Sequence, residues 1–510
     1  MSSQKHPSRL RLAVATLALR GLTVALLLLA PFPSRAAETK QLLVVLDGLR
    51  PDYVTSELMP NLHRLARRGV FFENHHAVYP TVTRVNASSI STGAYPRQHG
   101  LMGNSVYFPE VEADRSLTTS ERENLLRIEA ATGGHLLEAV TLGEVLAASG
   151  GRLMVGSSGS TGSSYLLNHT VAGGAIVHYD YVLPEELQAQ VYESIGPPPA
   201  ESSPSLPRHR WVVDAYLEVG LDQLDAEAAI LWLSDPDSTA HAHGIGAPET
   251  RKALAAVDGE LGRLVAGLEQ RRLGESVNIF VTSDHGFSTH RGGTDLEGMV
   301  KRTLGPDGAV VAGGAVYLRQ RDPLRLASLV RALQEAEWAG ALFTRAERSG
   351  DVLGAVPGTL SFDLIGWSHR RSADLLLSAN WSDEDNRFGY RGSTTLPGVA
   401  GHGTTSPWDI HNTLVAAGPG LKESLRTSVP SANVDLAPTF CHLLGLAPPA
   451  TMTGRVLAEA LRGGPDPSTV EVESVQHSAR ANGYQLTAHL SVVGAHRYLD
   501  RTVVRRSLRE

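Results

Sequence analysis

The chain has 510 residues, of which 42% are hydrophobic and 19% charged, and its formal net charge is -7. This composition is ordinary for a globular protein with a large core, and the acidic balance argues against a nucleic-acid-binding surface, which needs clustered basic residues. The single cysteine, Cys441, excludes an internal disulfide framework and a cysteine-rich metal cluster.

Residues 1–36 have the pattern of a secretory signal peptide. Basic residues precede an apolar run at 21–30 that is too short to span a bilayer as a free helix. Ser34 and Ala36 are the small residues expected before a cleavage site at Ala37. We therefore expect an exported protein, periplasmic or secreted, that has no membrane segment after cleavage. An uncleaved N-terminal anchor is the alternative.

From residue 42 onward, buried strands are predicted to alternate with amphipathic helices. Short apolar runs bounded by turn residues predict strands at 42–46, 152–156, 229–233 and 277–281. Helices are predicted at 59–68, from Ser88, and at 136–148, 211–224, 248–273 and 433–444. This alternation predicts an α/β fold with a mostly parallel sheet and helices on both faces.

The alternation is lost between residues 287 and 400, where strand patterns surround one helix near 324–336. We expect this segment to be an inserted cap subdomain over the sheet. The catalytic domain is then expected at 37–460, and the strand patterns that follow it predict a strand-rich C-terminal extension at 461–510.

Acidic and histidine residues follow the ends of three predicted strands, and one more histidine lies in a glycine-rich loop. These residues are Asp47, Asp237, His241, Asp284, His285 and His402. The carboxyl ends of parallel strands meet at one edge of a sheet, so all six are expected to converge there. Each pair alone also fits a turn or a helix cap. Together, mixed carboxylate and imidazole ligands suit zinc, with manganese or iron less favoured.

Six ligands suffice for two metals with three protein ligands each, an arrangement that serves phosphoryl transfer. The loop that holds Thr81 and Thr83 offers hydroxyl nucleophiles. It precedes a predicted helix, and the N-terminal amide groups of a helix favour a phosphate.

Several motifs resemble the type I phosphodiesterase/nucleotide pyrophosphatase family of the alkaline phosphatase superfamily. They are LDGLR at 46–50, PTVTRVN at 80–86, TGAYP at 92–96, HG at 99–100, Asn104, PDSTAH at 236–241, SDHG at 283–286, GHG at 401–403 and NVDLAP at 433–438. The resemblance covers most of residues 41–460. It implies an alkaline-phosphatase-like core and a two-zinc hydrolase that cleaves phosphodiester or pyrophosphate bonds in a small-molecule substrate.

Carried over by position, the resemblance implies a role for each site residue. Thr83 would be the nucleophile and contact one zinc, with Thr81 as its structural neighbour. The ligands of that zinc would be Asp47, Asp284 and His285, and those of the second zinc Asp237, His241 and His402. Asn104 would donate a hydrogen bond to a phosphoryl oxygen. The reaction implied has two steps and a phospho-threonine intermediate.

One ligand position has two candidates, and one other position departs from the family pattern. Asp235 is an alternative ligand to Asp237, but the four-residue step from Asp237 to His241 matches the family and lets both face one metal. Arg84 stands where family members usually have phenylalanine, which often helps form the wall for a nucleotide base. Arg84 therefore puts a nucleotide in doubt and favours binding of an extra anionic group, unless its side chain points to solvent.

Other functions remain open beside this interpretation. An alkaline-phosphatase-type phosphomonoesterase is one alternative. Phosphate-irrepressible alkaline phosphatases add a Lys-x-Arg pair, and residues 156–164, where it is expected, contain no basic residue. The nucleophile loop lacks the Cys/Ser-x-Pro-x-Arg motif of sulfatases. A phosphonoacetate hydrolase-like enzyme, or a non-catalytic exported protein that binds metal or phosphate, would keep the same fold. The sequence makes no prediction of the oligomeric state.

Overall fold

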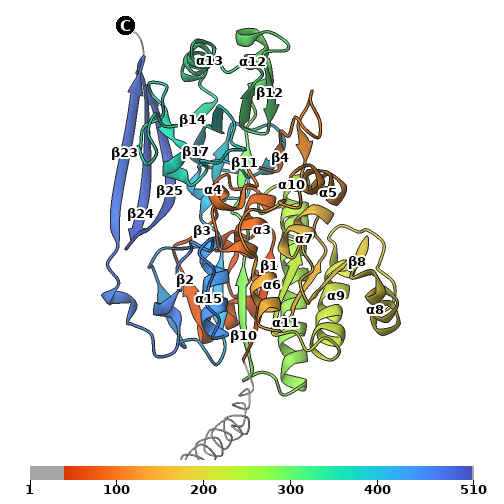
Figure 1. Cartoon of the computed structure of the whole chain (residues 1–510). Coiled ribbons are helices and arrows are strands. Elements are labelled where there is room, and N and C mark those ends of the chain that lie inside the picture. Colours follow the sequence, from red (N-terminus) through yellow and green to blue (C-terminus); the bar gives the residue numbers. More distant parts are fainter. Residues whose placement is uncertain (1–38, 508–510) are drawn as a thin grey trace, which may run out of the picture. The chain divides into compact units, whose positions relative to one another are not determined.

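The computed structural model describes residues 39–507, and the predicted signal peptide at 1–36 lies outside the described residues. A nine-stranded sheet forms the centre (Figure 1). Its strands are, in spatial order, β21 (Leu425–Thr427), β2 (Val70–Phe72), β20 (Leu414–Ala417), β10 (Val277–Thr282), β1 (Lys40–Leu46), β9 (Ala228–Leu233), β6 (Leu153–Ser157), β7 (Ala175–His178) and β8 (Tyr181–Leu183).

The central sheet is mostly parallel, as predicted. Strand β1 pairs in parallel with β10 on one side and β9 on the other, and β6 is parallel to β9 and β7. Antiparallel pairs occur at β20, with β10 and β2, and at β8. In register, Val45 lies opposite Thr282, and Leu46 lies opposite Leu233. The chain therefore leaves three neighbouring strands at the same edge.

Helices cover both faces of the sheet, which confirms the predicted α/β class. Along β1, Leu43 and Val45 pack into one apolar cluster and Leu42 and Val44 into another, since side chains alternate between faces. The first face carries α3 (Thr83–Thr92), α6 (Leu142–Ala148), α7 (Thr161–Leu167) and α15 (Leu436–Leu443). The second carries α2 (Pro60–Arg68), α9 (Leu206–Asp214) and α11 (Pro248–Gln270).

The helix after the nucleophile loop begins earlier than predicted. The sequence placed its start at Ser88, but α3 begins at Thr83, and no side chain of residue 82 caps it. The backbone N–H of Arg84 instead donates to Oδ1 of Asn104, 20 positions along the chain. An unpaired N–H of the first turn is thus satisfied by a distant side chain, which sequence signals for helix starts do not include.

Two further predicted helices have different bounds. Helix α6 begins at Leu142 rather than at 136, because Thr141 and Glu144 form a capping box there. The helix predicted at 211–224 begins earlier, as α9 at Leu206, and continues as a π-helix over Ala215–Leu221.

Residues 287–400 form most of two smaller sheets, two α-helices and a short 3-10 helix at Phe362–Ile365. The five-stranded sheet has the order β12 (Ala309–Ala312), β13 (Ala315–Leu318), β16 (Leu375–Ala379), β14 (Ala339–Thr344) and β15 (Leu360–Ser361). The four-stranded sheet contains β17 (Trp381–Asp385), β18 (Arg391–Thr394), β11 (Ser288–His290) and β19 (Ala400–Gly401). The helices are α12 (Leu296–Leu304) and α13 (Pro323–Glu335).

A three-stranded antiparallel sheet forms near the C-terminal end, drawn blue in Figure 1. Its strands are β23 (Glu473–Ala481), β24 (Tyr484–Val493) and β25 (His496–Arg506). The N–H of Thr502 donates to the carbonyl of Thr405 at 3.2 Å, and the hydroxyl of Tyr484 donates to the carbonyl of Gly340 at 2.7 Å. This sheet is therefore hydrogen-bonded to β14 and to the loop that follows β19. In residues 39–507 we find no helix with the length and apolarity needed to cross a membrane.

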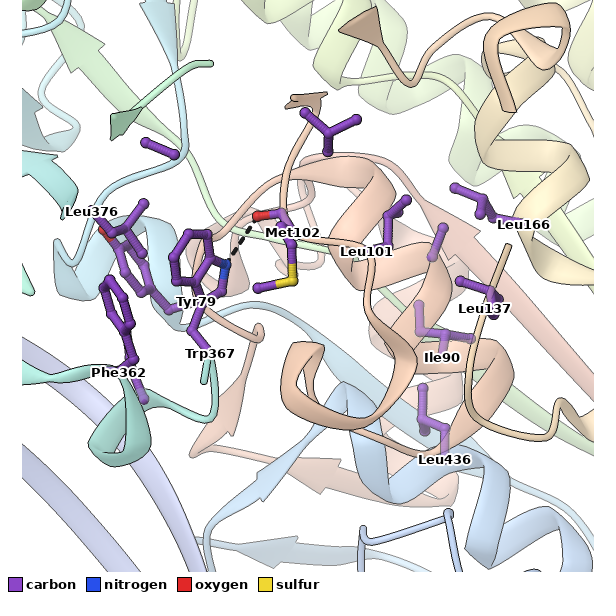
Figure 2. Close-up of a cluster of buried hydrophobic side chains, with 14 of the residues drawn as sticks. Tyr79, Ile90, Leu101, Met102, Leu137, Leu166, Phe362, Trp367, Leu376 and Leu436 are labelled. Carbon is purple, nitrogen blue, oxygen red and sulfur yellow. Dashed lines mark hydrogen bonds between the residues drawn. The ribbon is translucent and has the colours of Figure 1, made fainter. Parts of the chain in front are cut away.

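A buried tryptophan joins the 287–400 segment to the loop that leads to Asn104. The indole Nε1 of Trp367 donates to the carbonyl oxygen of Met102 at 2.9 Å, as Figure 2 shows. Trp367 is fully buried, and its ring packs edge-on against Phe362. The contact fixes the backbone two residues before Asn104.

Replacement of Trp367 should therefore destabilise the fold. We expect Trp367→Ala to lower the free energy of unfolding by about 3–5 kcal/mol, because it removes a large buried ring and leaves a cavity. Trp367→Phe should cost about 1–3 kcal/mol, mainly through the unsatisfied carbonyl of Met102. Urea unfolding monitored by circular dichroism measures both. Equal midpoints for the wild type and Trp367→Ala would contradict the packing described.

Candidate metal centre

Asp47, Asp284 and His285 form the first of two groups at the carboxyl edge of the sheet. Asp47 directly follows β1, and the other two residues follow β10. Nε2 of His285 lies 3.1 Å from Oδ2 of Asp284 and 3.6 Å from Oδ1 of Asp47. All three side chains are buried. One ligand atom from each lies within 4.8 Å of the others, which suits a single cation.

Asp237, His241 and His402 form the second group. Asp237 and His241 lie one turn apart on α10 (Asp237–His243), and His402 follows β19. Oδ1 of Asp237 lies 3.3 Å from Nε2 of His241 and 3.5 Å from Nε2 of His402. The rings of His402 and His285 stack with centroids 3.4 Å apart, so the two groups are in contact.

The two groups differ in exposure. The side chains of Asp284 and His285 are 0% exposed, whereas that of His241 is 44% exposed. The second group is therefore more accessible to solvent than the first, in which only Asp47 is exposed, at 8%.

Each histidine presents the same ring nitrogen to the carboxylates. Nδ1 of His285, His241 and His402 lies 3.0, 2.9 and 2.8 Å from the carbonyl oxygens of Gly286, Ala400 and Thr81, respectively. A carbonyl only accepts a hydrogen bond, so Nδ1 carries the proton and Nε2 of the neutral ring keeps its lone pair. Histidines that bind metals are commonly oriented in this way.

Three carboxylate oxygens at this edge have no hydrogen-bond donor among residues 39–507. They are Oδ1 of Asp47, Oδ2 of Asp284 and Oδ1 of Asp237, the same atoms that face the histidine rings. The second oxygen of Asp47 accepts from Nε1 of Trp232 at 2.9 Å, and that of Asp284 accepts from the N–H of Gly48 at 3.1 Å. Buried acceptors without donors are costly, so this donor set fits cations.

The pKa shifts agree with a site built for cations. Burial raises the pKa of Asp47 well above its usual range, and the charges of Asp284 and Asp237 raise it further. Burial opposes the charged forms of His285 and His241, but the nearby carboxylates raise both pKa values above the ordinary value. Without metal, protons bound to Asp47 and to the histidines therefore reduce the repulsion between the carboxylates.

Thr83 of the predicted nucleophile loop adjoins the first group, and Asn104 contacts the backbone next to it. Oγ1 of Thr83 lies 3.3 Å from Nε2 of His285, and Thr83 is the first residue of α3. Oδ1 of Asn104 accepts from the N–H of Arg84 at 3.0 Å, which turns the Nδ2 amide group of Asn104 away from that backbone. A hydroxyl and an amide donor therefore flank the start of a helix beside the carboxylates.

Arg84 also lies among the acidic residues. Burial lowers the pKa of its guanidinium, and Asp47, Asp237 and Asp284 act in the opposite direction. Its Nε atom is buried and has no hydrogen-bond partner in the described part of the chain. The side chain is half-buried and close to the carboxylates, so the alternative that it simply points to solvent is disfavoured.

The contacts of Thr81 and Asp235 distinguish them from Thr83 and Asp237, the other candidates for the same roles. The hydroxyl of Thr81 donates to the carbonyl of Thr404 at 2.9 Å, away from the carboxylates. Asp235 accepts from His209 Nε2 at 3.0 Å and from the Thr239 hydroxyl at 2.6 Å, so its carboxylate is already satisfied. The geometry thus brings Thr83 and Asp237 to the metal groups and gives Thr81 and Asp235 structural contacts.

Sequence reasoning missed several residues that support the site. Trp232 was assigned only to a buried strand, yet it orients Asp47. The side-chain amide of Asn433 donates to Asn86 Oδ1 at 3.0 Å and to the carbonyl of Asp284 at 2.9 Å, and so connects α3 to the end of β10. Both asparagines lie in the motifs PTVTRVN and NVDLAP, so the motifs could have indicated their importance.

Two glycines allow close approach beside the ligands. Gly48 has φ of +71°, and a Cβ atom there would lie 3.0 Å from Cβ of Asp237. A Cβ atom at Gly286 would collide with the carbonyl oxygen of Trp408. A larger residue at Gly48 would press on the ligand Asp237, and one at Gly286 would displace the backbone of Trp408.

Comparison with known proteins identifies the family. The sequence matches the family model described as type I phosphodiesterase / nucleotide pyrophosphatase over residues 41–382. The chain belongs to this family. The resemblance predicted from the motifs is therefore confirmed.

Similar proteins include both sequences and solved structures. Venom phosphodiesterase CdcPDE of Crotalus durissus collilineatus is 30% identical over 261 residues, which cover 50% of this chain and 27% of that protein. Ectonucleotide pyrophosphatase/phosphodiesterase family member 1 of Rattus norvegicus is 30% identical over 258 residues, which cover 50% of this chain and 25% of that protein. The alignment thus spans about a quarter of the length of these curated relatives.

The fold is similar to that of murine ectonucleotide pyrophosphatase/phosphodiesterase 5. The two structures superpose with a TM-score of 0.60 and 18% identity, over 83% of this chain and 100% of the murine chain. The similarity supports the predicted fold class.

Zinc affinity should fall as the pH is lowered. Zinc must displace the protons of His285 and His241, whose pKa values are raised above the ordinary 6.5, and the proton of Asp47. Each proton displaced weakens binding by up to about tenfold per pH unit below the pKa of its group. Competition with a chromophoric chelator at pH 8 and pH 6 measures the change. Equal affinities at the two pH values would contradict the protonation described.

Proposed function

We propose that the protein is an exported hydrolase of phosphodiester or phosphoanhydride bonds that uses Thr83 as its nucleophile and two divalent ions, preferably zinc. The observation that carries the proposal is the position of the Thr83 hydroxyl, 3.3 Å from His285 Nε2, beside two groups of metal ligands. Export rests on the signal pattern at residues 1–36.

The chemistry proceeds in two steps on the side chain of Thr83. Its Oγ1 forms a bond to phosphorus while the bond to the leaving oxygen breaks, and the proton lost by Thr83 ends on the leaving group. Water then cleaves the phospho-threonine, which restores the hydroxyl and releases the phosphoryl product. When bound, two divalent ions supply Lewis acidity for both steps.

Each neighbouring residue has a role in this scheme. The N-terminus of α3 favours the phosphoryl oxygens, and the Nδ2 amide of Asn104 donates a hydrogen bond to one of them. Asp47, Asp284 and His285 would hold one ion, and Asp237, His241 and His402 would hold the other. Since the side chain of His241 is 44% exposed, departure of the leaving group and entry of water on that side would meet the least obstruction.

One relative supports both the nucleophile and a nucleotide substrate. A solved structure of murine ectonucleotide pyrophosphatase/phosphodiesterase 5 holds AMP in an inactive threonine-to-alanine variant. A nucleotide phosphoester is therefore a suitable first substrate class to test here. Arg84 adds a positive charge beside the phosphoryl position and favours substrates with a second phosphate, such as nucleoside di- and triphosphates.

Removal of the Thr83 hydroxyl tests the nucleophile. Thr83→Ala should lower hydrolysis of bis-p-nitrophenyl phosphate at least about 10³-fold, because no other group can form the covalent intermediate. Thr83→Ser keeps a hydroxyl at the same place and should retain part of the activity. Zinc content, measured on each variant, controls for loss of metal. Full activity in Thr83→Ala would exclude Thr83 as the nucleophile.

The same assay separates diester from monoester hydrolysis. We expect bis-p-nitrophenyl phosphate to be a better substrate than p-nitrophenyl phosphate. The reverse preference, still dependent on Thr83, would favour an alkaline-phosphatase-type phosphomonoesterase. Zinc-loaded protein that turns over neither substrate would direct the search to phosphonates or to a binding role.

Arg84 is tested by comparing substrates of different charge. Arg84→Ala should lower kcat/KM for ATP by about 10–100-fold, since a charge-assisted hydrogen bond to a phosphate contributes about 1.5–3 kcal/mol. The loss for bis-p-nitrophenyl phosphate, which has no second phosphate, should be smaller. Arg84→Lys retains the charge and should recover part of the ATP rate. Equal losses on both substrates would contradict selective binding of a second phosphate.

A further inference from the structure

A third cluster of potential metal ligands lies outside the two groups described above. It consists of His76 on β3 (His75–His76), His411 directly after α14 (Pro407–Ile410), and Asp500 on β25. One ligand atom from each residue lies within 4.8 Å of the other two. His76 is buried, while His411 and Asp500 are half-buried.

The contacts of His76 repeat the arrangement of the catalytic histidines. Its Nδ1 lies 2.8 Å from the carbonyl oxygen of Ser431, which only accepts a hydrogen bond, so Nδ1 carries the proton. Nε2 of the neutral ring then directs a lone pair at Oδ1 of Asp500, 2.9 Å away. Two acceptors at this distance require either a second proton on the ring or a cation between them.

His411 provides a second imidazole ring to the cluster. It packs against His76 with ring centroids 4.6 Å apart and has a hydrogen bond to the backbone of His75. One of its ring nitrogens lies within 4.8 Å of the ligand atoms of His76 and Asp500, where it can serve as a third ligand.

The third ligand, Asp500, lies at an irregularity of the C-terminal sheet. His489 pairs with Arg501 and Leu490 pairs with Leu499, so Asp500 is the extra residue of a β-bulge between β24 and β25. Bulges redirect side chains and are common next to functional sites. The hydroxyl of Ser491 lies 3.0 Å from both carboxylate oxygens and holds the group toward His76.

A cation has access to the cluster. His76 lines a cavity of about 370 Å³ together with Tyr498 and Leu499, and His411 lines another of about 240 Å³ together with Trp408. The charge of Arg501 acts on His411, and the arginines Arg497 and Arg50 line the two cavities. Asp500 offsets the charge of Arg501.

We propose that His76, His411 and Asp500 form a third metal site, which binds a zinc-class divalent ion and joins the C-terminal sheet to the catalytic loops. Two imidazoles and one carboxylate are a ligand set that suits zinc. His76 lies seven positions before Thr83, and His411 lies nine positions after His402. A bound ion therefore cross-links the nucleophile loop, the His402 loop and β25.

Counting bound zinc tests this site independently of the proposed activity. The full chain is stripped with a chelator, dialysed against zinc, and its zinc per chain is measured by mass spectrometry. We expect three equivalents for the wild type and two for Asp500→Asn, which keeps the shape of the side chain and its contact with Ser491. His477→Gln, on β23 and outside the cluster, should keep three.

The difference of one equivalent holds whether or not Thr83 is the nucleophile and whether or not the catalytic groups are filled. If Asp500→Asn does not fold, the zinc count of His411→Gln is compared with that of the wild type instead. Zinc should also slow amide hydrogen exchange of β25 in the wild type but not in Asp500→Asn. Equal zinc counts in the wild type and Asp500→Asn would overturn the proposal and leave an ion pair between His76 and Asp500.

Discussion

The mutual repulsion of Asp47, Asp237 and Asp284 is the constraint on which the catalytic region depends. Two like charges about 4 Å apart repel by about 4 kcal/mol at an effective dielectric constant near 20, and burial adds a desolvation cost. The protein does not relieve this repulsion with hydrogen bonds, because one oxygen of each carboxylate has no donor in residues 39–507. Instead, the Nε2 lone pairs of three imidazoles face those oxygens. Because all of these atoms are acceptors, only protons or cations make the arrangement favourable.

The central sheet and a buried polar network hold this unfavourable arrangement in place. Strands β10, β1 and β9 end in register, so the carboxylates meet at one edge. Asn433 connects Asn86 of α3 to the backbone of Asp284, and Trp232 and Gly48 each satisfy one carboxylate oxygen. Satisfied hydrogen bonds of this kind make a buried site rigid, so the unpaired oxygens cannot turn away from one another.

Local sequence patterns predicted the parts of the fold and site that depend on neighbouring residues. The core strands are short apolar runs bounded by turns, and Asp47 and Asp284 follow such strands closely, so their convergence could be inferred from the topology of a parallel sheet. The predicted start of α3 was wrong because the N–H of Arg84, in its first turn, is satisfied by Asn104, 20 positions away. His76 and Asp500 are 424 positions apart, and no periodicity in the sequence connects them.

The unequal exposure of the two ligand groups has a consequence for the proposed metal binding. A group with a half-exposed histidine should exchange a bound ion with the medium more readily than a buried group, which must open before it releases one. If both groups bind ions, as proposed above, the group that contains His241 would empty first when metal becomes scarce. A half-loaded form would then persist until the outer group captures another ion from the medium.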